Sequence, residues 1–366
     1  MMKRVSRNPY AAVDWDTWTT RKAQLHTHTT ESDGDFTPAQ VIDRYHDRRF
    51  DILAITDHDT YMNNNAGRST WPWTDYGRDP DTLGMLAVRG NEFSDVPHAV
   101  GLFTDMWLPS DPFQDRKKDF AWILNEVGER DGLLELAHPS RSQEVNIHGN
   151  APEWFVTRMA AHSHLLGIEI HTMTARADNG GLTLWDPIIT DLRTQQLDLP
   201  AWGYSVDDSH IDGDYGLNYQ LHPMPALTEQ AMRDSLTSGA FFSCVDPLGN
   251  SLDRHTHAGE GLWVPVPTVT RITVTRHAIT LDAHDYASIN WVTSGGVSVG
   301  SGEKLQLDTE GLGLYVRAVL TGSNSELTYT QPFYLEDADG VGWTKRGEAL
   351  APADLSVLRD GRVIYI

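Results

Sequence analysis

Cysteine is nearly absent from the 366-residue sequence, in which Cys244 is the only one. A single cysteine excludes an internal disulfide, and a thiolate metal site would need more than one such residue. No apolar run approaches the ~20 residues that a membrane helix requires. The basic residues near the N-terminus are not followed by an apolar segment, so we expect no signal peptide, no membrane association and a cytoplasmic location.

Positive charge is also scarce. The 29 Lys and Arg residues face 51 Asp and Glu residues, which gives a formal net charge of −22. This balance argues against a basic nucleic-acid groove, and we expect no binding to duplex nucleic acid. Anionic substrates are still possible, because bound divalent cations can supply positive charge locally. The chain has 16 histidines, so their positions become the main source of functional information.

The segment from about residue 23 to 240 alternates short apolar runs with amphipathic stretches. Seven runs are expected to be strands: residues 23–28, 50–58, 83–92, 98–103, 132–139, 167–170 and 199–208. One intervening helix has a clear start, with Thr37 as N-cap, Pro38 at the first helical position and Gln40 completing a capping box. Alternation of strands and helices predicts a parallel β/α architecture, and seven strands favour a barrel.

The character of the sequence changes near residue 250. Beyond this point, short β-type runs are separated by Gly, Asn and Asp turns, which is typical of a small antiparallel β-sandwich. We therefore divide the chain into a β/α barrel domain at 1–250 and an all-β, sandwich-like domain at 251–366. Within the first domain, residues 59–82 form a long connection without apolar periodicity, and such a connection is usually functional.

Potential metal ligands lie at the ends of the expected strands. These are His26, His28, His58, Glu92, His98, His138, Asp208 and His210, and a further candidate, Asp33, follows within eight positions of His26. In a β/α barrel the C-terminal ends of the strands meet at one mouth, so groups far apart in sequence converge there. Residues i and i+2 of a strand point the same way, so His26 and His28 can hold one ion. Each histidine alone is more often a cap or a surface residue, but the combination predicts a metal site.

Imidazole and carboxylate ligands suit Zn, Mn and Fe, and cysteine is not required. Glu92 can bridge two cations with its two oxygens. A divalent cation also lowers the pKa of a bound water, which makes a nucleophile available near neutral pH. Asp57, next to His58, is expected to orient a ligand rather than to bind a metal. Asp59 and Asp207 are expected to be solvent-exposed or to lie behind the ligands.

The motifs HTHTTESDG, ITDHDT, GNEFS, PHAVGLF, LAHP and DDSH, between about residues 20 and 245, resemble in order the signatures of the polymerase and histidinol phosphatase (PHP) superfamily. The resemblance implies a distorted seven-stranded β/α barrel that holds two to three divalent ions. It assigns His26, His28, Glu92 and Asp208 to the first ion, Glu92, His98 and His138 to the second, and Asp33, His58 and His210 to the third. The C-terminal runs resemble the β-domain of two-domain PHP-type proteins, among them carbaryl hydrolases and predicted phosphoesterases.

Three functions are compatible with these patterns. The first is a metal-dependent phosphoesterase acting on a small anionic phosphoester, with Glu92 and Asp208 as catalytic metal ligands. Arg141, three residues after His138, would bind the phosphate. An equally good interpretation is that Arg141 pairs with Glu144 in a loop. Arg68 and Arg78 are further candidates. The alternative is hydrolysis of a carboxylic or aryl carbamate ester, for which Trp71 and Trp73 would form an aromatic pocket unless they pack in the core. The third is a non-catalytic binding protein.

Overall fold

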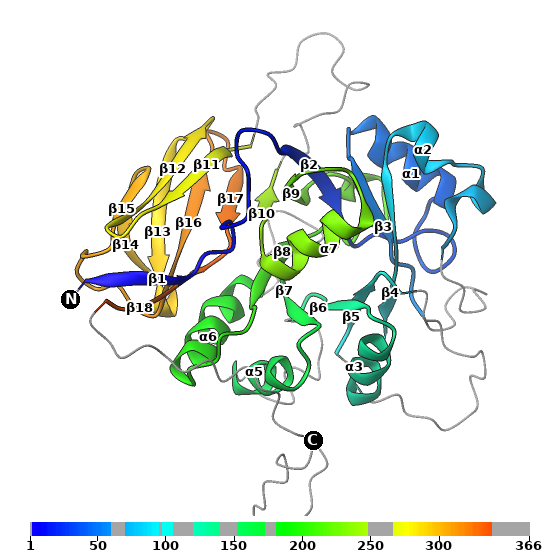
Figure 1. Ribbon diagram of the computed structural model, residues 1–366. Coiled ribbons are helices and arrows are strands. Elements are labelled where there is room, and N and C mark those ends of the chain that lie inside the picture. The colour runs from blue at the N-terminus through cyan, green and yellow to red at the C-terminus, as the bar shows by residue number, and fades with distance from the viewer. Residues whose placement is uncertain are drawn as a thin grey trace, which may run out of the picture.

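The computed structural model describes residues 2–59, 70–94, 97–104, 120–139, 152–172, 181–247 and 266–338. Two parts lie side by side in Figure 1, a mixed α/β part and a β-rich part that carries the strands labelled β11 to β18 together with β1. The prediction of a mixed α/β domain followed by an all-β domain is confirmed in this coarse form.

Among the described residues, the α/β part has a strand at each of the seven expected places and two more. The strands are β2 (Thr19–Gln24), β3 (Ile52–Ile55), β4 (Leu86–Phe93), β5 (Ala99–Leu102), β6 (Leu133–Leu136), β7 (Leu165–His171), β8 (Trp202–Ser205), β9 (Asn218–Met224) and β10 (Phe242–Val245). The helices are α1 (Pro38–Asp47), α2 (Pro80–Leu83), α3 (Phe120–Glu129), α5 (Pro152–Ala161), α6 (Gly181–Thr194) and α7 (Glu229–Ser238). Short 3₁₀ turns lie at Trp73–Tyr76 and Asp212–Asp214.

The strand directions differ from the all-parallel arrangement expected from the sequence. β2, β3 and β4 are parallel, as are β6, β7 and β8, but β5 runs antiparallel to both β4 and β6. The turn between Phe93 and Ala99 is too short for the crossover that a parallel pair needs, so the chain reverses there. As a consequence, the residue that begins β5 lies at the same end of the sheet as the residues that follow β3 and β6.

At this end of the sheet, the segment that follows β2 contacts the segment that follows β8. Beyond the two strands, a parallel bridge joins Thr27 to Ser209. The amide of Asp208 donates to the carbonyl of His26, and the amide of His28 donates to the carbonyl of Ser209, both at 3.0 Å. The histidine motif that follows β2 is therefore hydrogen-bonded directly to the acidic motif that follows β8.

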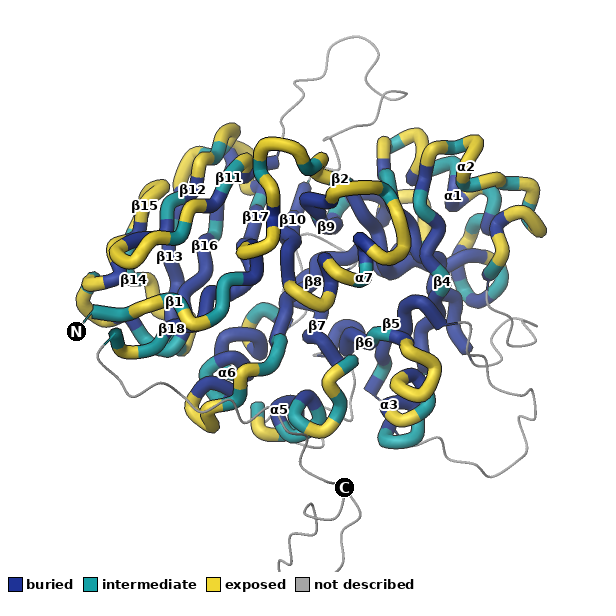
Figure 2. The backbone as a smooth tube through the Cα atoms, viewed as in Figure 1, coloured by how far each residue is buried: buried dark blue, intermediate teal, exposed yellow. Residues whose placement is uncertain are grey.

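The β-rich part consists of two sheets. One contains β11 (Thr268–Val274), β12 (Ala278–His284) and β15 (Lys304–Gln306). The other contains β13 (Ser288–Thr293), β14 (Val297–Ser301), β16 (Tyr315–Thr321), β17 (Leu327–Thr330) and β18 (Phe333–Asp337), with a 3₁₀ turn at Ser294–Gly296. Apolar side chains of both sheets, among them Ile279, Trp291 and Leu320, share one core. In Figure 2 the strands labelled β13 and β16 are mostly dark blue, which marks buried residues.

The two parts of the chain share one continuous sheet. β17 pairs with β10 of the α/β part, and β1 (Lys3–Arg7) pairs antiparallel with β18. The N-terminal strand thus pairs with the last described strand of the β-rich part, although it falls within the segment 1–250 predicted as the first domain, and the division into two domains stays a prediction. Sequence patterns could not reveal this, because the pairing joins opposite ends of the chain. The expected boundary at residue 250 lies outside the described residues.

Several local expectations are confirmed. Helix α1 begins with the expected capping box, in which the Thr37 amide donates to Gln40 Oε1 at 2.9 Å and the Gln40 amide donates to Thr37 Oγ1 at 3.4 Å. Of the long connection, the structure describes Asp59 and residues 70–82, in which Trp73 is buried with 1% of its surface exposed. Among the described helices, none combines the length and the apolar character needed to cross a bilayer.

Candidate metal centre

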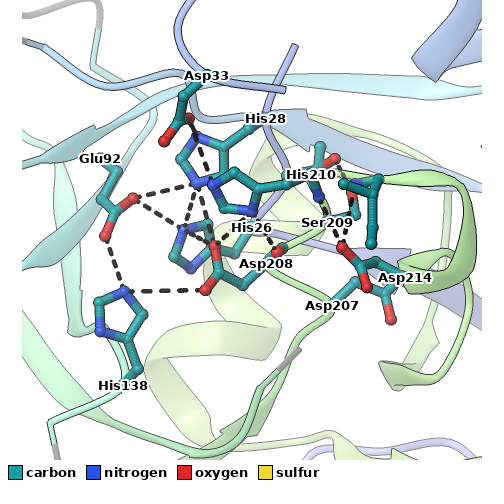
Figure 3. A network of polar contacts seen from close by, with 12 residues as sticks. His26, His28, Asp33, Glu92, His138, Asp207, Asp208, Ser209, His210 and Asp214 are labelled. Carbon is teal, nitrogen blue, oxygen red and sulfur yellow. Dashed lines mark hydrogen bonds and ion pairs between the residues drawn. The ribbon is translucent and has the colours of Figure 1, made fainter. Parts of the chain in front are cut away.

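The nine predicted ligand side chains come together at the common end of the strands. His26 and His28 follow β2, Asp208 and His210 follow β8, and Glu92 lies near the end of β4. His58 and His138 follow β3 and β6, and Asp33 lies in the turn after His28. His98 precedes β5 and reaches the same place because that strand is reversed. Figure 3 labels seven of the nine, His26, His28, Asp33, Glu92, His138, Asp208 and His210, gathered close to one another.

The central group consists of two histidines and two carboxylates. The Nε2 atoms of His26 and His28 are 3.1 Å apart. Glu92 Oε2 lies 3.2 Å from the first and 3.1 Å from the second, and Asp208 Oδ1 lies 3.3 and 3.2 Å from them. All four side chains are almost fully buried. Four potential ligand atoms from three strand ends therefore surround one point.

Two more groups flank the centre. On one side, Glu92 Oε1 is 2.7 Å from His98 Nδ1 and 3.0 Å from His138 Nε2. On the other side, Asp33 Oδ1 is 3.3 Å from His210 Nε2 and Asp33 Oδ2 is 3.5 Å from His58 Nε2. The two oxygens of Glu92 thus face different histidines, which is the geometry that a bridging carboxylate needs.

The geometric grouping of the ligand atoms differs in detail from the assignment that the PHP resemblance implies. Three sets could each hold an ion: His26, Glu92, His138 and Asp208; His28, Asp33, His58 and His210; and His58, Glu92 and His98. His138 falls in the central set, and His28 lies between the central set and the one around Asp33. The allocation of individual residues to individual ions stays a prediction.

The hydrogen-bond partners of the imidazole nitrogens explain why this cluster suits a cation. His26 Nδ1 is 2.6 Å from Glu169 Oε1 and must carry the proton, because an ionised carboxylate only accepts. His210 Nδ1 likewise donates to the Asp208 carbonyl at 2.8 Å. When these two imidazoles are neutral, Nε2 carries a lone pair, and this lone pair points at carboxylate oxygens. Acceptors facing acceptors repel one another unless a proton or a metal ion lies between them, so the donor set fits divalent cations.

The electrostatics of the cluster support the same reading. Burial disfavours the charged form of His28, but hydrogen bonds with Asp208 and Glu92 outweigh it and raise its pKa to about 10. Burial would likewise raise the pKa of Glu92, but His26 and His58 outweigh it and hold the pKa well below its usual range. Burial would also raise the pKa of Asp33, but hydrogen bonds with His210 and His58 together outweigh it and lower the pKa. The carboxylates are therefore ionised and demand positive charge.

Glu169 is a buried residue of the site that the sequence reasoning missed. It lies on β7, accepts from His26 Nδ1 through Oε1, and accepts from the His138 backbone amide through Oε2, both at 2.6 Å. One carboxylate thus fixes the imidazole of one ligand and the backbone of another. The available signal was a charged residue in the middle of the apolar run GIEI. Its partner His26 is 143 positions away.

Two aspartates next to ligands hold the loops that carry them. Asp57 accepts from the Thr29 amide and hydroxyl, each at 2.7 Å, and from the Ser32 hydroxyl at 2.6 Å. It is therefore behind the ligands, as expected from the sequence. Asp59 is 4% exposed and accepts from the Ser94 amide at 2.9 Å, so it is not a solvent-exposed residue.

Asp207 is likewise buried and not exposed to solvent. It accepts from Tyr45 Oη at 2.9 Å and from the amides of Gly216, Leu217 and Asn218 at 2.6, 2.9 and 2.8 Å. Burial raises the pKa of Asp207 to about 6, against the effect of these hydrogen bonds. The aspartate therefore fixes the chain directly before the ligand Asp208.

The backbone of the site is unusual at two ligands. His138 and Asp208 have φ values of 27° and 50°, which lie in the left-handed region that non-glycine residues rarely adopt. Such conformations persist only where surrounding contacts enforce them, and they concentrate at functional sites. In the turn that presents Asp33, a side chain on Gly34 would meet the His28 carbonyl at 2.7 Å, so only glycine fits there.

The predicted phosphate-binding arginines have different outcomes. Arg141 and Arg68 lie outside the described residues. Arg78 pairs with Asp43, with Nε donating to Oδ1 at 2.7 Å and Nη2 to Oδ2 at 2.5 Å, so it serves to anchor the segment after Trp73 to helix α1. Its role in phosphate binding is therefore not supported.

Comparisons with known proteins agree with this fold. No protein-family model and no curated protein matches the chain by sequence. A two-domain protein from Bacteroides vulgatus, containing a predicted PHP-like metal-dependent phosphoesterase, is similar in structure at 14% identity, with a TM-score of 0.50 over 90% of this chain and 98% of that one. The fold of both parts is thus that of a two-domain PHP-like protein, which confirms the predicted resemblance at the level of fold.

Smaller structures give lower scores. An amidohydrolase from Chromobacterium violaceum with bound sulfate matches with a TM-score of 0.38 at 17% identity, covering 59% of this chain and 96% of its own. A putative metal-dependent phosphoesterase from Bifidobacterium adolescentis matches with a TM-score of 0.35 at 15% identity over the same shares.

Proposed function

We propose that this protein is a metal-dependent hydrolase that cleaves a small phosphoester. The observation that supports this most directly is the convergence of nine histidine and carboxylate side chains, with imidazole nitrogens 3.1 to 3.3 Å from carboxylate oxygens in the buried centre. When bound there, two or three divalent cations would lower the pKa of water and stabilise negative charge on phosphoryl oxygens. Zn, Mn and Fe all suit such ligands.

The residues of the chain have definite tasks in this proposal. His26, His28 and Asp208 hold the central cation, and Glu92 connects it with the group that contains His98 and His138. Glu169 keeps the His26 proton on Nδ1, so that Nε2 stays available as a ligand. Asp33 and His210 would complete one side of the cluster. Both retain more than a fifth of their side-chain surface, as does His98 on the opposite side, so substrate could reach the cations past these three residues.

The charge balance bears on the substrate. Two or three dications outweigh the three carboxylates among the ligands, so the loaded site is positive inside a protein whose net charge is −22. A phosphate group can contact two or more cations, which a carbamate does poorly. The negative surface repels long polyanions. We therefore expect small phosphoesters to be favoured and duplex DNA to be excluded.

The alternative of an aryl ester or carbamate pocket rested on two tryptophans. Trp73 is 1% exposed and packs in a core cluster, and Trp71 packs against the same cluster. Both side chains thus hold the segment onto the domain, and they give no support to an aromatic substrate pocket.

The test combines metal analysis with a substrate panel. Protein purified without added metal should contain two to three equivalents of a divalent transition metal, and removing them with a chelator should abolish hydrolysis. The panel contains bis-nitrophenyl phosphate, nitrophenyl phosphate, nitrophenyl acetate and naphthyl carbamate, and phosphoesters should be turned over fastest. Hydrolysis that survives metal removal would contradict the metallohydrolase proposal. Ready cleavage of the carbamate with no cleavage of phosphoesters would replace the substrate class.

A further inference from the structure

The edge of strand β8 is closed in an unusual way. β8 pairs with β7 on one side, while no strand in the described part of the chain forms a ladder with it on the other. Only beyond the strand do backbone bonds resume, from Asp208 to His26 and from His28 to Ser209. Buried backbone groups along such an edge need partners, since leaving them unpaired is costly.

Fully buried glutamine side chains supply these partners. Gln331, between β17 and β18, accepts from the Gly203 amide at 2.9 Å through Oε1 and donates to the Gly203 carbonyl at 2.8 Å through Nε2. Further along the chain from Gly203, the Gln220 side chain donates to the Ser205 carbonyl at 2.5 Å, and the Gln24 side chain accepts from the Asp207 amide at 3.2 Å. The primary amide of Gln331 thus imitates a neighbouring strand, and it comes from the β-rich domain.

Gly203 is held from two further directions. The Ser243 hydroxyl donates to its carbonyl at 2.5 Å. On the helix side, a Cβ on Gly203 would lie 2.8 Å from the ring of Trp185, so the strand is pressed directly against α6. Gln331 itself is held in place through its backbone. Its backbone amide donates to Tyr10 Oη at 2.9 Å, and the Tyr10 hydroxyl donates to the Phe241 carbonyl at 2.9 Å. Both partners of the contact, Gly203 and Gln331, are therefore held in place by further hydrogen bonds or packing.

We propose that Gln331 is a positioning residue for the metal centre, by which the β-rich domain sets the place of β8 and of the two ligands that follow it. Gly203 lies five residues before Asp208 and seven before His210. A shift of β8 would move both ligands away from His26 and His28, which lie on another strand end. This inference rests on the proposed metal site, and it assigns to the β-rich domain a part in building that site.

The test compares two neighbouring substitutions. Gln331→Met preserves the shape but removes both bonds to Gly203. The matched control is Thr330→Val, which removes a buried bond of the same kind, from the Ala318 amide to Thr330 Oγ1 at 2.9 Å, entirely within the β-rich domain. Each purified protein is titrated with Zn²⁺ against a chelator of known affinity, and its melting temperature is recorded without metal.

We expect Gln331→Met to weaken binding of at least one Zn²⁺ by about 10-fold or more, which is the usual size of effect for groups behind metal ligands. Thr330→Val should change Zn²⁺ affinity less than about twofold while lowering the melting temperature comparably. Ser243→Ala, which removes only one bond to Gly203, is a milder variant in case Gln331→Met does not fold, and it should weaken Zn²⁺ binding by a smaller factor. Unchanged Zn²⁺ affinity in folded Gln331→Met, or in Ser243→Ala where the first does not fold, would overturn the inference. Failure of the unsubstituted protein to bind any of Zn²⁺, Mn²⁺ and Fe²⁺ would instead overturn the proposed function.

Discussion

Two buried clusters of charged side chains in this molecule differ in one respect. Between the domains, Arg317 of β16 donates to both oxygens of Asp186 on α6, at 3.0 and 2.6 Å, and Tyr315 donates to the same carboxylate at 2.5 Å. There each ionised acceptor faces a donor. In the cluster around Glu92, ionised acceptors face imidazole nitrogens, which can donate to them only when they are protonated. In the first cluster both carboxylate oxygens have donors from the protein, whereas the second requires protons or cations between its nitrogens and oxygens, which separates a structural role from a binding role.

The largest effect should follow from removing the histidine pair. We expect His26→Ala with His28→Ala to lower hydrolysis by about three orders of magnitude or more, or about 4 kcal/mol of transition-state stabilisation. At least one equivalent of metal should be lost, because both Nε2 atoms face the central carboxylates. Metal analysis and circular dichroism of the same sample measure loading and folding. Wild-type metal content together with wild-type activity would rule out this ligand assignment.

Breaking the interdomain pair should affect stability and leave the metal centre occupied. Asp186→Ala leaves Arg317 buried without its partner, and we expect a loss of about 3–5 kcal/mol in the free energy of unfolding. Replacing both, as Asp186→Leu with Arg317→Met, should recover much of this loss because no charge remains buried. Chemical denaturation measures the stability, and metal analysis of the folded variants should match the unsubstituted protein. A metal loss as large as in the histidine variant would refute the separation of roles.

An intermediate effect is expected at Glu169. Glu169→Gln keeps the shape but replaces one carboxylate oxygen by a donor, so the amide can no longer accept from both His26 Nδ1 and the His138 amide. We expect metal affinity or activity to fall about 10- to 100-fold. The matched control is Glu326→Gln, a buried carboxylate that accepts from the Asn324 amide in a turn of the β-rich domain. Equal effects of the two substitutions on metal affinity would argue against a role of Glu169 in orienting ligands.

The smallest effect is a pH dependence of the metal-free protein. The pKa of His28 rises from an ordinary 6.5 to about 10 in the fold. Because the pKa is raised by folding, protonated His28 stabilises the folded metal-free protein. This contribution to the free energy of unfolding is fully present below about pH 6.5 and is lost as pH rises toward 10. We expect the melting temperature of chelator-treated protein to fall by about 5 °C across this window. Zn²⁺ should remove the decline, since metal competes better as protons leave.

Scanning fluorimetry at intervals from pH 6.5 to 9.5, with and without Zn²⁺, measures this dependence. The control is the protein with both His26 and His28 replaced, which should lose most of the slope. A flat profile in the metal-free, unsubstituted protein would contradict the electrostatic description of the cluster.

Sequence reasoning reached the nine clustered side chains because eight of them lie close to an apolar run that forms a strand, and Asp33 follows shortly after two of these, His26 and His28. It could not reach Glu169 or Gln331 in the same way. Their partners, His26 and Gly203, are far away in the chain, and a buried glutamate or glutamine leaves no periodic signal. The reversal of β5 was missed for another reason. Apolar runs predict strands but not their directions, so His98 could be placed near a strand start without explaining why it reaches the site.

The pairing of β1 with β18 has a consequence for biosynthesis. The register joins Lys3 with Asp337, so these partners leave the ribosome roughly 330 residues apart. At ~5–20 residues per second, β1 would wait on the order of 20 to 60 s for its partner. During that time the strands of the α/β part have already been made, while β1 has nothing to pair with. Closure of the β-rich domain by its first strand is therefore expected to be among the last steps of folding, and until then β18 presents an open edge to other chains.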